Sequence, residues 1–246
     1  MQISGKTVVI TGGGAGIGLD LAKAFLSNGA KVIICGRNLS RLEQAQADNP
    51  GLEIMQCDVT NEEQILALRE RCDAEFGGAD ILVNNAGVLT QMDLVKGDTT
   101  LEHQLKEIDI NVNGPIRMVY HFLPGLLQKP EAAIVNVSSS LAYIPYAAIP
   151  VYSATKAGLH SWTLSLRKQL EDTNVRVFEL MPPLVDTDMA SEMEGMPKMS
   201  PEKLATTFIN SFLNNKDEIV PGMGGALKFM SRISPRMMMN MMARQG

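Results

Sequence analysis

Thr7-Val-Val-Ile-Thr-Gly-Gly-Gly-Ala-Gly-Ile-Gly18 joins a run of β-branched residues directly to a glycine-rich turn, and a helical pattern follows at Leu19–Ser27. Glycine lets a backbone turn tightly and approach a ligand closely. The start of a helix offers free N–H groups and a positive dipole end to an anion. Such a stretch could be only a turn. Its place between a first strand and a first helix favours a nucleotide-phosphate site instead.

The spacing of this turn is T-G-x-x-x-G-x-G. No register of Gly12–Gly18 satisfies the G-x-G-x-x-G pattern of many dinucleotide-binding folds. We expect the phosphates to lie against Gly12, Gly14, Gly16, Ile17 and Gly18.

The rest of the chain alternates short, mostly apolar, β-branched runs with helical segments. Asn61–Phe76 is one such helix, with Asn61 as its N-cap and two glutamates in its first turn. The alternation predicts an α/β fold: one domain with a doubly wound parallel sheet and helices on both faces. The expected strands are Lys6–Thr11, Lys31–Cys35, Glu53–Cys57, Ile81–Asn84, Ala133–Val137 and Val175–Leu180.

Composition and charge narrow the class of protein. The chain has 246 residues, a length that suits a single α/β domain. Its formal net charge of −5 gives no global basic character, so we expect no nucleic-acid partner. No stretch reaches the roughly 18 apolar residues that cross a membrane, and no basic, apolar leader precedes the first strand. We expect a cytoplasmic protein without a transmembrane segment.

The cysteines and histidines do not suggest a metal site. Cys35, Cys57 and Cys72 are odd in number, form no C-x-x-C motif and stand in or beside apolar stretches. Buried thiols are therefore expected. The histidines show no ligand spacing, so no metal is expected.

The end of the second strand selects the dinucleotide. A carboxylate there binds the ribose 2′-hydroxyl of NAD, whereas an arginine accommodates the 2′-phosphate of NADP. Here the strand leads into Gly36-Arg37-Asn38, and no acidic residue occurs between Asp20 and Glu43. Arg37 could be only a solvated loop charge. We predict that it binds the phosphate, with Arg41 as a second cation, and that the cofactor is NADP(H).

Tyr152 and Lys156 stand four residues apart in Val151-Tyr-Ser-Ala-Thr-Lys156, which places both on one face of a helix. A phenol has a pKa of roughly 10, and a nearby positive charge lowers it. Such a pair can exchange a proton with an alcohol or carbonyl oxygen. By itself the spacing also fits an exposed helix pair, so its meaning depends on the other motifs.

Four further motifs follow in order. They are Cys57-Asp-Val-Thr60, Asn84-Asn-Ala-Gly87, Asn111-Val-Asn-Gly114 and Val135-Asn-Val-Ser-Ser139. Together with the glycine-rich turn and the Tyr152–Lys156 pair, they resemble the short-chain dehydrogenase/reductase family, whose fold is Rossmann-type. The match runs from about residue 5 to about residue 190. The run from Ala132 to Ser139 and that from Tyr152 to Ala157 are similar to the branch that includes the oxidoreductase of teichoic-acid D-alanylation operons.

The resemblance implies a catalytic role at four positions. Tyr152 would be the general acid/base, and Lys156 would lower its pKa and bind the nicotinamide ribose. Ser139 would orient the substrate oxygen. Asn111 would support a water that links Lys156 to solvent, although its side chain could instead bind helix backbone.

The resemblance also assigns the remaining cofactor contacts. Asp58 and the backbone of Val59 would meet the adenine, although Asp58 could simply cap a turn. The turn Asn84–Gly87 would line the adenosine side. The full set of expected cofactor contacts is Gly12, Gly14, Gly16, Ile17, Gly18, Arg37, Asp58, Val59, Asn85, Ala86, Gly87, Tyr152, Lys156, Pro182, Val185 and Thr187.

The chain departs from the family pattern in two places. The family usually shows Pro-Gly after the sixth strand, whereas this chain has Pro182-Pro183, which cannot adopt glycine's geometry. Val185 and Thr187 still align with positions that hold the nicotinamide carboxamide. After Pro221 the chain lacks the usual final strand ending in Asp-Gly-Gly.

These departures define two segments. We expect residues 1–222 to form the dinucleotide-binding catalytic domain, including a substrate lid at about 186–200, and residues 223–246 to form a Met-rich, basic tail. The tail either covers the pocket, packs on a neighbouring subunit or lies on a membrane surface. The expected substrate side is largely apolar and comprises Leu141, Tyr143, Ile144, Tyr146, Leu184, Met189, Met193 and Met196.

The sequence thus predicts an NADPH-dependent oxidoreductase that interconverts a carbonyl and a secondary alcohol on a largely apolar small molecule. The alternatives are a dinucleotide-binding sensor or scaffold without turnover, and a protein that docks to a membrane or partner through its tail. A homodimer is expected, since helical segments at about 103–128 and 153–171 hold more apolar residues than one core-facing stripe needs.

Overall fold

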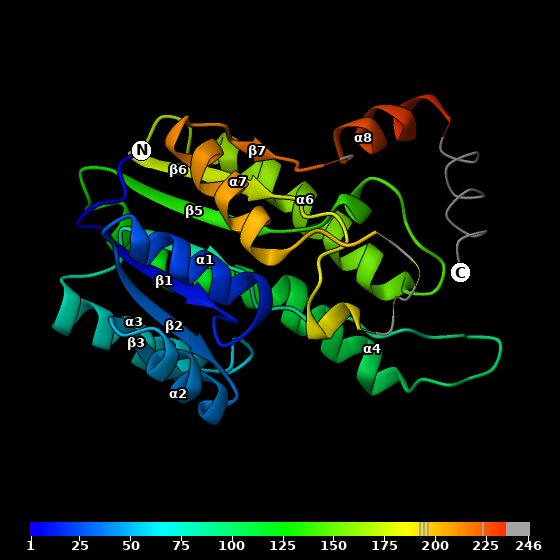
Figure 1. Cartoon of the computed structure of the whole chain (residues 1–246), viewed down its shortest axis with the longest axis horizontal. Helices are drawn as coiled ribbons and strands as arrows, with labels where there is room; N and C mark the ends of the chain where they lie inside the picture. Colours follow the sequence, from blue (N-terminus) through cyan, green and yellow to red (C-terminus); the bar gives the residue numbers. More distant parts are fainter. Residues whose placement is uncertain (192, 194, 196, 223, 235–246) are drawn as a thin grey trace.

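The computed structural model describes residues 1–191, 193, 195, 197–222 and 224–234. Its strands and helices alternate along the chain (Figure 1). The strands are β1 (Thr7–Thr11), β2 (Lys31–Gly36), β3 (Leu52–Gln56), β4 (Ile81–Asn84), β5 (Ala132–Val137), β6 (Val175–Leu180) and β7 (Glu218–Ile219). The helices are α1 (Gly16–Ser27), α2 (Leu39–Asp48), α3 (Glu62–Phe76), α4 (Leu101–Ile108), α5 (Gly114–Leu126), α6 (Pro150–Gln169), α7 (Pro201–Leu213) and α8 (Gly224–Ile233). Short helices η1 (Asp109–Asn113), η2 (Ser140–Ala142) and η3 (Asp188–Ala190) complete the order.

The seven strands form one parallel sheet in the order β3-β2-β1-β4-β5-β6-β7. β1 lies between β2 and β4, so the chain reverses its direction of winding there. In open α/β sheets this switch point, at the carboxyl ends of the strands, is where ligands bind.

Each face of the sheet buries its own apolar core. Val8 and Ile10 of β1 face the core that α1, α2 and α7 cover, and Val9 faces the core that α3, α5 and α6 cover. Successive side chains of a strand point to opposite faces, so strands buried on both faces need continuous apolar runs. The predicted doubly wound α/β fold is confirmed.

The predicted elements agree closely with the structure. Ile81–Asn84 and Val175–Leu180 match β4 and β6, three of the other predicted strands differ by one residue at one end, and Glu53–Cys57 is shifted by one residue from β3. Asn61 caps α3, and its side chain accepts a hydrogen bond from the Gln64 N–H at 3.1 Å.

Three features were not predicted. Helix α1 begins at Gly16, inside the glycine-rich turn, and therefore earlier than Leu19. Asn111 lies in the π-helical turn η1, which joins α4 to α5. A seventh strand, β7, forms before Pro221, although it has only two residues.

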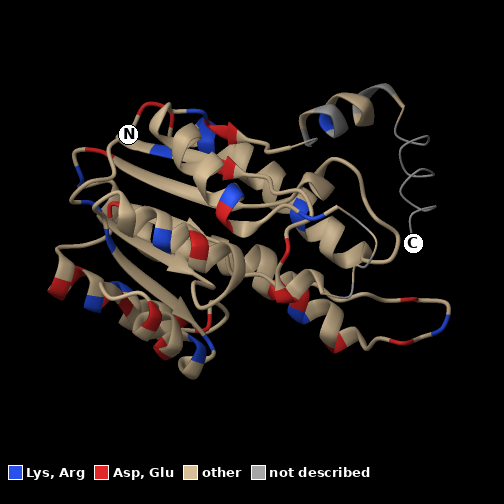
Figure 2. Cartoon of the chain, in the orientation of Figure 1, with Lys and Arg blue, Asp and Glu red and all other residues tan. Residues whose placement is uncertain are grey.

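Charged residues of both signs are interspersed along the helices and loops (Figure 2). Within the part of the chain that the structure describes, no helix is long and apolar enough to cross a membrane. All three cysteines are buried free thiols, as predicted.

Candidate active site

Most predicted site residues follow the carboxyl ends of the strands, whereas Tyr152 and Lys156 lie on α6 and Asn111 in η1. The glycine-rich turn follows β1. Gly12 has a φ of +65°, and a Cβ atom there would lie 2.9 Å from the Cα of Ala86. At Gly18 a Cβ atom would lie 2.3 Å from the carbonyl oxygen of Gly12. Only glycine fits such close backbone approaches.

Asn85 and Thr11 join the turn to the end of β4. The Asn85 amide donates to the carbonyl oxygens of Thr11 and Gly12, at 3.0 and 3.2 Å. The Thr11 hydroxyl accepts the backbone N–H groups of Asn85 and Ala86, both at 3.0 Å. These bonds fix the cradle, and they give the predicted Asn85 a role in building the site.

The start of α1 is not capped by a side chain, because its N-cap residue is Ala15. Its first N–H groups are therefore free to bind an anion. Beside it lies a hollow of about 130 Å³. It is lined by Gly12, Gly36, Arg37, Cys57, Asp58, Val59, Ala86, Gly87, Val88 and Ile110.

Arg37 follows β2 and Asp58 follows β3, and both border this hollow. The Arg37 side chain is exposed, and no ion pair involves it among the described residues. Asp58 Oδ1 accepts the backbone N–H and the hydroxyl of Thr60 at 2.9 and 2.8 Å. Asp58 therefore caps a turn and lines the hollow at the same time. Arg41, the expected second cation, instead pairs with Asp188 at 3.3 Å.

The segment after β6 crosses over the phosphate turn. The Pro182 carbonyl accepts the N–H of Ser140 at 3.0 Å, and buried Val185 forms a bridge with Met199. Thr187 lies so close that a Cβ atom at Gly16 would be 3.1 Å from its methyl group. Thr187 thus lies beside the glycine-rich turn despite the two prolines, whereas Val185 is buried in the core that α1 and α7 cover.

Tyr152, Lys156 and Ser139 meet where α6 passes the end of β5. The Lys156 ammonium lies 5.5 Å from the centroid of the Tyr152 ring and donates to the Val137 carbonyl at 2.9 Å. The Ser139 hydroxyl accepts the N–H of Leu141 at 3.1 Å and lies near enough to the phenol to lower its pKa. The three side chains could engage one substrate oxygen.

Burial is the largest cause of the pKa shifts of Tyr152 and Lys156. It raises the pKa of Tyr152 to about 12, although the Ser139 hydrogen bond lowers it. It lowers the pKa of Lys156 to about 8, against the charges of Glu107 and Glu179. The lowering of the Tyr152 pKa that was expected from Lys156 is not found, because burial destabilises the phenolate and raises this pKa.

Asn111 is buried, and its amide holds two segments together. Its oxygen accepts the Val88 N–H at 2.9 Å, and its nitrogen donates to the Val88 carbonyl and the Thr155 hydroxyl, at 2.9 and 3.1 Å. Asn111 thus bonds the loop after β4 and helix α6, and not the backbone of its own helix.

The expected apolar substrate side is only partly assembled around Tyr152. Buried Tyr146, Ile149 and Met193 form a cluster. Its partly buried neighbours are Leu89, Leu141, Ala148, Tyr152 and Leu184. Tyr143 points elsewhere, since its hydroxyl donates to Glu218 at 2.8 Å. Met189 is exposed, and Met196 lies outside the described residues.

Two buried acids near Lys156 escaped the sequence analysis. Glu179 of β6 is fully buried, accepting the Ser138 hydroxyl at 2.6 Å and contacting His160 Nδ1 at 2.8 Å. Glu107 of α4 is also buried. The sequence offered one signal for each acid: Glu179 is the only acid in an apolar strand, and Glu107 lies one helical turn before Asn111.

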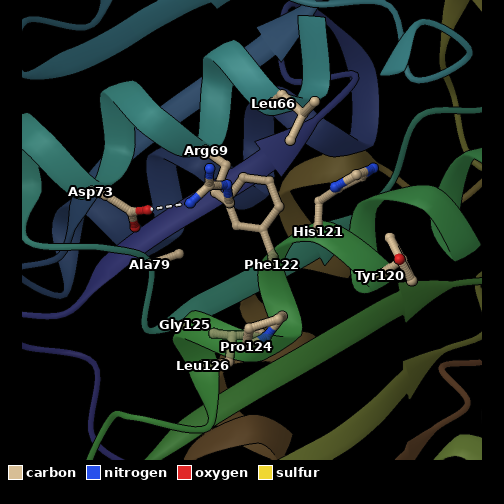
Figure 3. Close-up of a pocket in the computed structure, with 10 residues that line it drawn as sticks. All are labelled: Leu66, Arg69, Asp73, Ala79, Tyr120, His121, Phe122, Pro124, Gly125 and Leu126. Carbon is tan, nitrogen blue, oxygen red and sulfur yellow. Dashed lines mark hydrogen bonds and ion pairs between the residues drawn. The ribbon is translucent and has the colours of Figure 1, made fainter. Parts of the chain in front are cut away.

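A second hollow lies away from this chemistry. It measures about 400 Å³ and lies between α3 and α5, where Arg69 pairs with Asp73 at 2.9 Å and Tyr120 stands at the rim (Figure 3). It contains none of the predicted site residues. The described residues contain no group of His, Cys, Asp and Glu side chains that could hold a metal ion.

Comparisons with known proteins agree with this geometry. The family model described as short chain dehydrogenase matches residues 6–198. An uncharacterized oxidoreductase of Bacillus subtilis, DltE, is 43% identical over 224 residues, which cover 89% of each chain.

Solved structures show the same fold. A short chain dehydrogenase from Burkholderia cenocepacia in complex with NADP has a TM-score of 0.87 at 25% identity, covering 98% of this chain and 99% of that one. One from Burkholderia phymatum in complex with NAD has a TM-score of 0.83 at 24% identity, covering 93% of each.

The chain therefore belongs to the short-chain dehydrogenase family of oxidoreductases. Within that family, the similarity to DltE confirms the branch that the sequence predicted.

Proposed function

We propose that this protein is an NADPH-dependent oxidoreductase that interconverts a carbonyl and a secondary alcohol. The observation that carries the proposal is the meeting of Ser139, Tyr152 and Lys156 at the end of β5, beside the cluster that contains Tyr146 and Met193. A small, largely apolar molecule suits that cluster. A sensor or scaffold without turnover would not need this set of acid–base groups.

The residues present fit a dinucleotide. The uncapped start of α1 and the glycines beside it suit a pyrophosphate, and the hollow at Asp58 and Val59 suits an adenine. Arg37 favours a 2′-phosphate, because its side chain has no ion pair in the described chain and no acid stands at the end of β2. One solved relative binds NADP and another NAD, so the choice rests on Arg37.

The chain's own groups supply orientation and the proton. A bound nicotinamide would provide or accept the hydride. In reduction, Tyr152 donates its proton to the substrate oxygen while Ser139 shares the charge that develops there. Lys156 stabilises the phenolate that remains, and Asn111 fixes the loop after β4 against α6.

The test is a panel of ketones and aldehydes with NADPH and NADH, followed by the absorbance of the reduced cofactor. We expect turnover of apolar carbonyls with NADPH. No oxidation of NADPH with any carbonyl, despite dinucleotide binding in calorimetry, would favour the sensor.

The homodimer and the cytoplasmic location remain part of this proposal. Exposed apolar side chains gather on α4, on and directly after α5, and on α6, as a partner-covered face requires. They are Leu101, Leu105, Ile116, Tyr120, Leu127 and Leu164. Sedimentation of Tyr120→Asp should show loss of the dimer, whereas Leu213→Asp on α7 should keep it.

The tail is proposed to dock on its own subunit. Lys228 of α8 pairs with Glu218 and lies 5.3 Å from the centroid of the Tyr143 ring. Burial opposes the ionisation of Glu218, but Lys228 and Tyr143 hold its pKa below the usual value. One basic residue of the tail is thus engaged in the subunit, which argues against a membrane surface. Met223 and residues 235–246 lie outside the described residues.

A further inference from the structure

Glu107 is a buried acid that the chemistry above leaves without a role. Its exposed fraction is 1%, and neither carboxylate oxygen has a partner in hydrogen-bond geometry among the described residues. Thr90, in the loop after β4, is the polar group beside it. A buried carboxylate without partners is costly unless it takes up a proton. Groups in such surroundings are candidates for function.

The position of Glu107 ties it to the catalytic groups. It lies four residues before Asn111, at the junction of α4 with the π-helical turn η1, and such turns often occur at functional sites. A Cβ atom at Gly87 would lie 3.3 Å from Asn111 Oδ1 and 3.7 Å from Lys156 Nζ. Asn111 and Lys156 therefore both border Gly87, and Glu107 precedes Asn111 by about one helical turn.

The titratable groups that face Glu107 come from α6. Lys156 lowers the pKa of Glu107, and Glu107 in turn raises the pKa values of Lys156 and Tyr152. From η1, the acid Asp109 is already paired with Arg117 at 2.9 Å. Burial, opposed by Thr90 and Lys156, raises the pKa of Glu107 to about 7, whereas that of Lys156 is about 8. The two groups therefore interact electrostatically, and a change in the charge of one alters the proton affinity of the other.

We propose that Glu107 is a positioning residue for proton transfer, which holds the proton that returns through Lys156 to Tyr152 after each reduction. The idea rests on the proposed function. In the first proton transfer, the Tyr152 O–H bond breaks and its proton goes to the substrate oxygen. Lys156 then gives a proton to the phenolate, and Glu107 gives its own proton, through water, to Lys156. Glu107 finally regains a proton from solvent, and no electrons move in these transfers.

The kinetic test compares kcat for carbonyl reduction between pH 6 and pH 9 in wild type, Glu107→Gln and Glu107→Asp. The control is Glu102→Gln, an exposed acid on the same helix. Wild type should exceed Glu107→Gln about tenfold at pH 6, somewhat below the ~10²–10⁴-fold contribution of a group that transfers the proton directly. The ratio should fall to about one at pH 9, where Glu107 has lost its proton. Glu107→Asp should recover part of the difference, and it serves as the test variant should Glu107→Gln not fold.

A second measurement needs no turnover. The carboxyl carbon signal of Glu107 in ¹³C NMR, assigned by its loss in Glu107→Gln, should titrate near pH 7 and move to higher pH in Lys156→Met. A titration near pH 4, or no movement in Lys156→Met, overturns the relay. So does an unchanged pH profile of kcat, a loss of rate that is equal at every pH, or a rise in KM alone. If wild type reduces no carbonyl, the proposed function fails, and the NMR titration still decides whether Glu107 and Lys156 are coupled.

Discussion

Replacing Glu107 with glutamine should stabilise the fold, and the gain should grow with pH. The substitution keeps the shape of the side chain and removes its charge. In the folded protein, burial raises the pKa of Glu107 from an ordinary 4.5 to about 7. Between these two pH values the folded state binds a proton that the unfolded state has lost. The stability of the wild type therefore falls as pH rises through this window. The stability of Glu107→Gln does not fall in this way, because glutamine does not ionise.

The structure gives the size of the effect. A difference between 4.5 and about 7, at 1.36 kcal/mol per pH unit, corresponds to at most about 3 kcal/mol. The gain of Glu107→Gln over wild type should be smallest below pH 4.5 and complete above about pH 7. The loss of stability with rising pH should be larger in Lys156→Met than in wild type, because Lys156 lowers the pKa of Glu107.

The assay is urea unfolding at several pH values between 4 and 8, at one protein concentration so that any dimer contributes equally. Glu102→Gln, exposed on the same helix, is the control and should follow wild type at every pH. A difference between Glu107→Gln and wild type that stays constant across this range would refute the reasoning, since it would mean that Glu107 titrates alike in both states.

Four further predictions follow from the site. Tyr152→Phe should lower kcat by about 10²–10⁴-fold in the carbonyl assay and leave the Kd for NADPH nearly unchanged, because only the proton-transferring hydroxyl is lost; a wild-type kcat would remove Tyr152 from the chemistry. Arg37→Asp should shift the ratio of the Kd values for NADPH and NADH tenfold or more toward NADH, since a charge-assisted hydrogen bond contributes roughly 1.5–3 kcal/mol; the exposed Lys203→Asp on α7 should not, and an unchanged Kd for NADPH would rule out the phosphate contact. Gly18→Ala should reduce the free energy of unfolding by about 1–3 kcal/mol and weaken dinucleotide binding, because its Cβ would lie 2.3 Å from a backbone oxygen; Gly158→Ala, with nothing within 4 Å, should not destabilise in the same unfolding assay. Hydrogen exchange in the proposed lid, residues 186–200, should slow when NADPH and substrate bind; equal exchange with and without ligands would indicate a fixed loop.

Much of the fold could be predicted because its signals are local. Runs such as Thr7–Thr11 and Ala132–Val137 are buried on both faces of the sheet, so the continuous apolar pattern marks them directly. The site also follows from strand order, since the carboxyl ends of parallel strands meet at one edge. Gly12, Arg37 and Asp58 follow three different strands, and all three line one hollow.

The missed elements are those whose form depends on distant contacts. β7 has two residues, and it exists because Glu218 and Ile219 pair with β6. The turn η1 has no local signal, since Asp109–Asn113 reads as ordinary helix. The direction of Tyr143, toward Glu218 and Lys228 and away from the Tyr152 cluster, depends on where β7 and α8 pack.

The two buried acids show what a sequence pattern alone does not distinguish. Glu179 and Glu107 both raise the pKa of Lys156, yet their surroundings differ. Glu179 accepts the hydroxyl of Ser138 and contacts His160 Nδ1, so each of its carboxylate oxygens has a partner. Glu107 has none among the described residues, so its charge can change with pH. A sequence marks both simply as acids among apolar residues, and only the hydrogen bonds around each distinguish an acid with fixed partners from one without them.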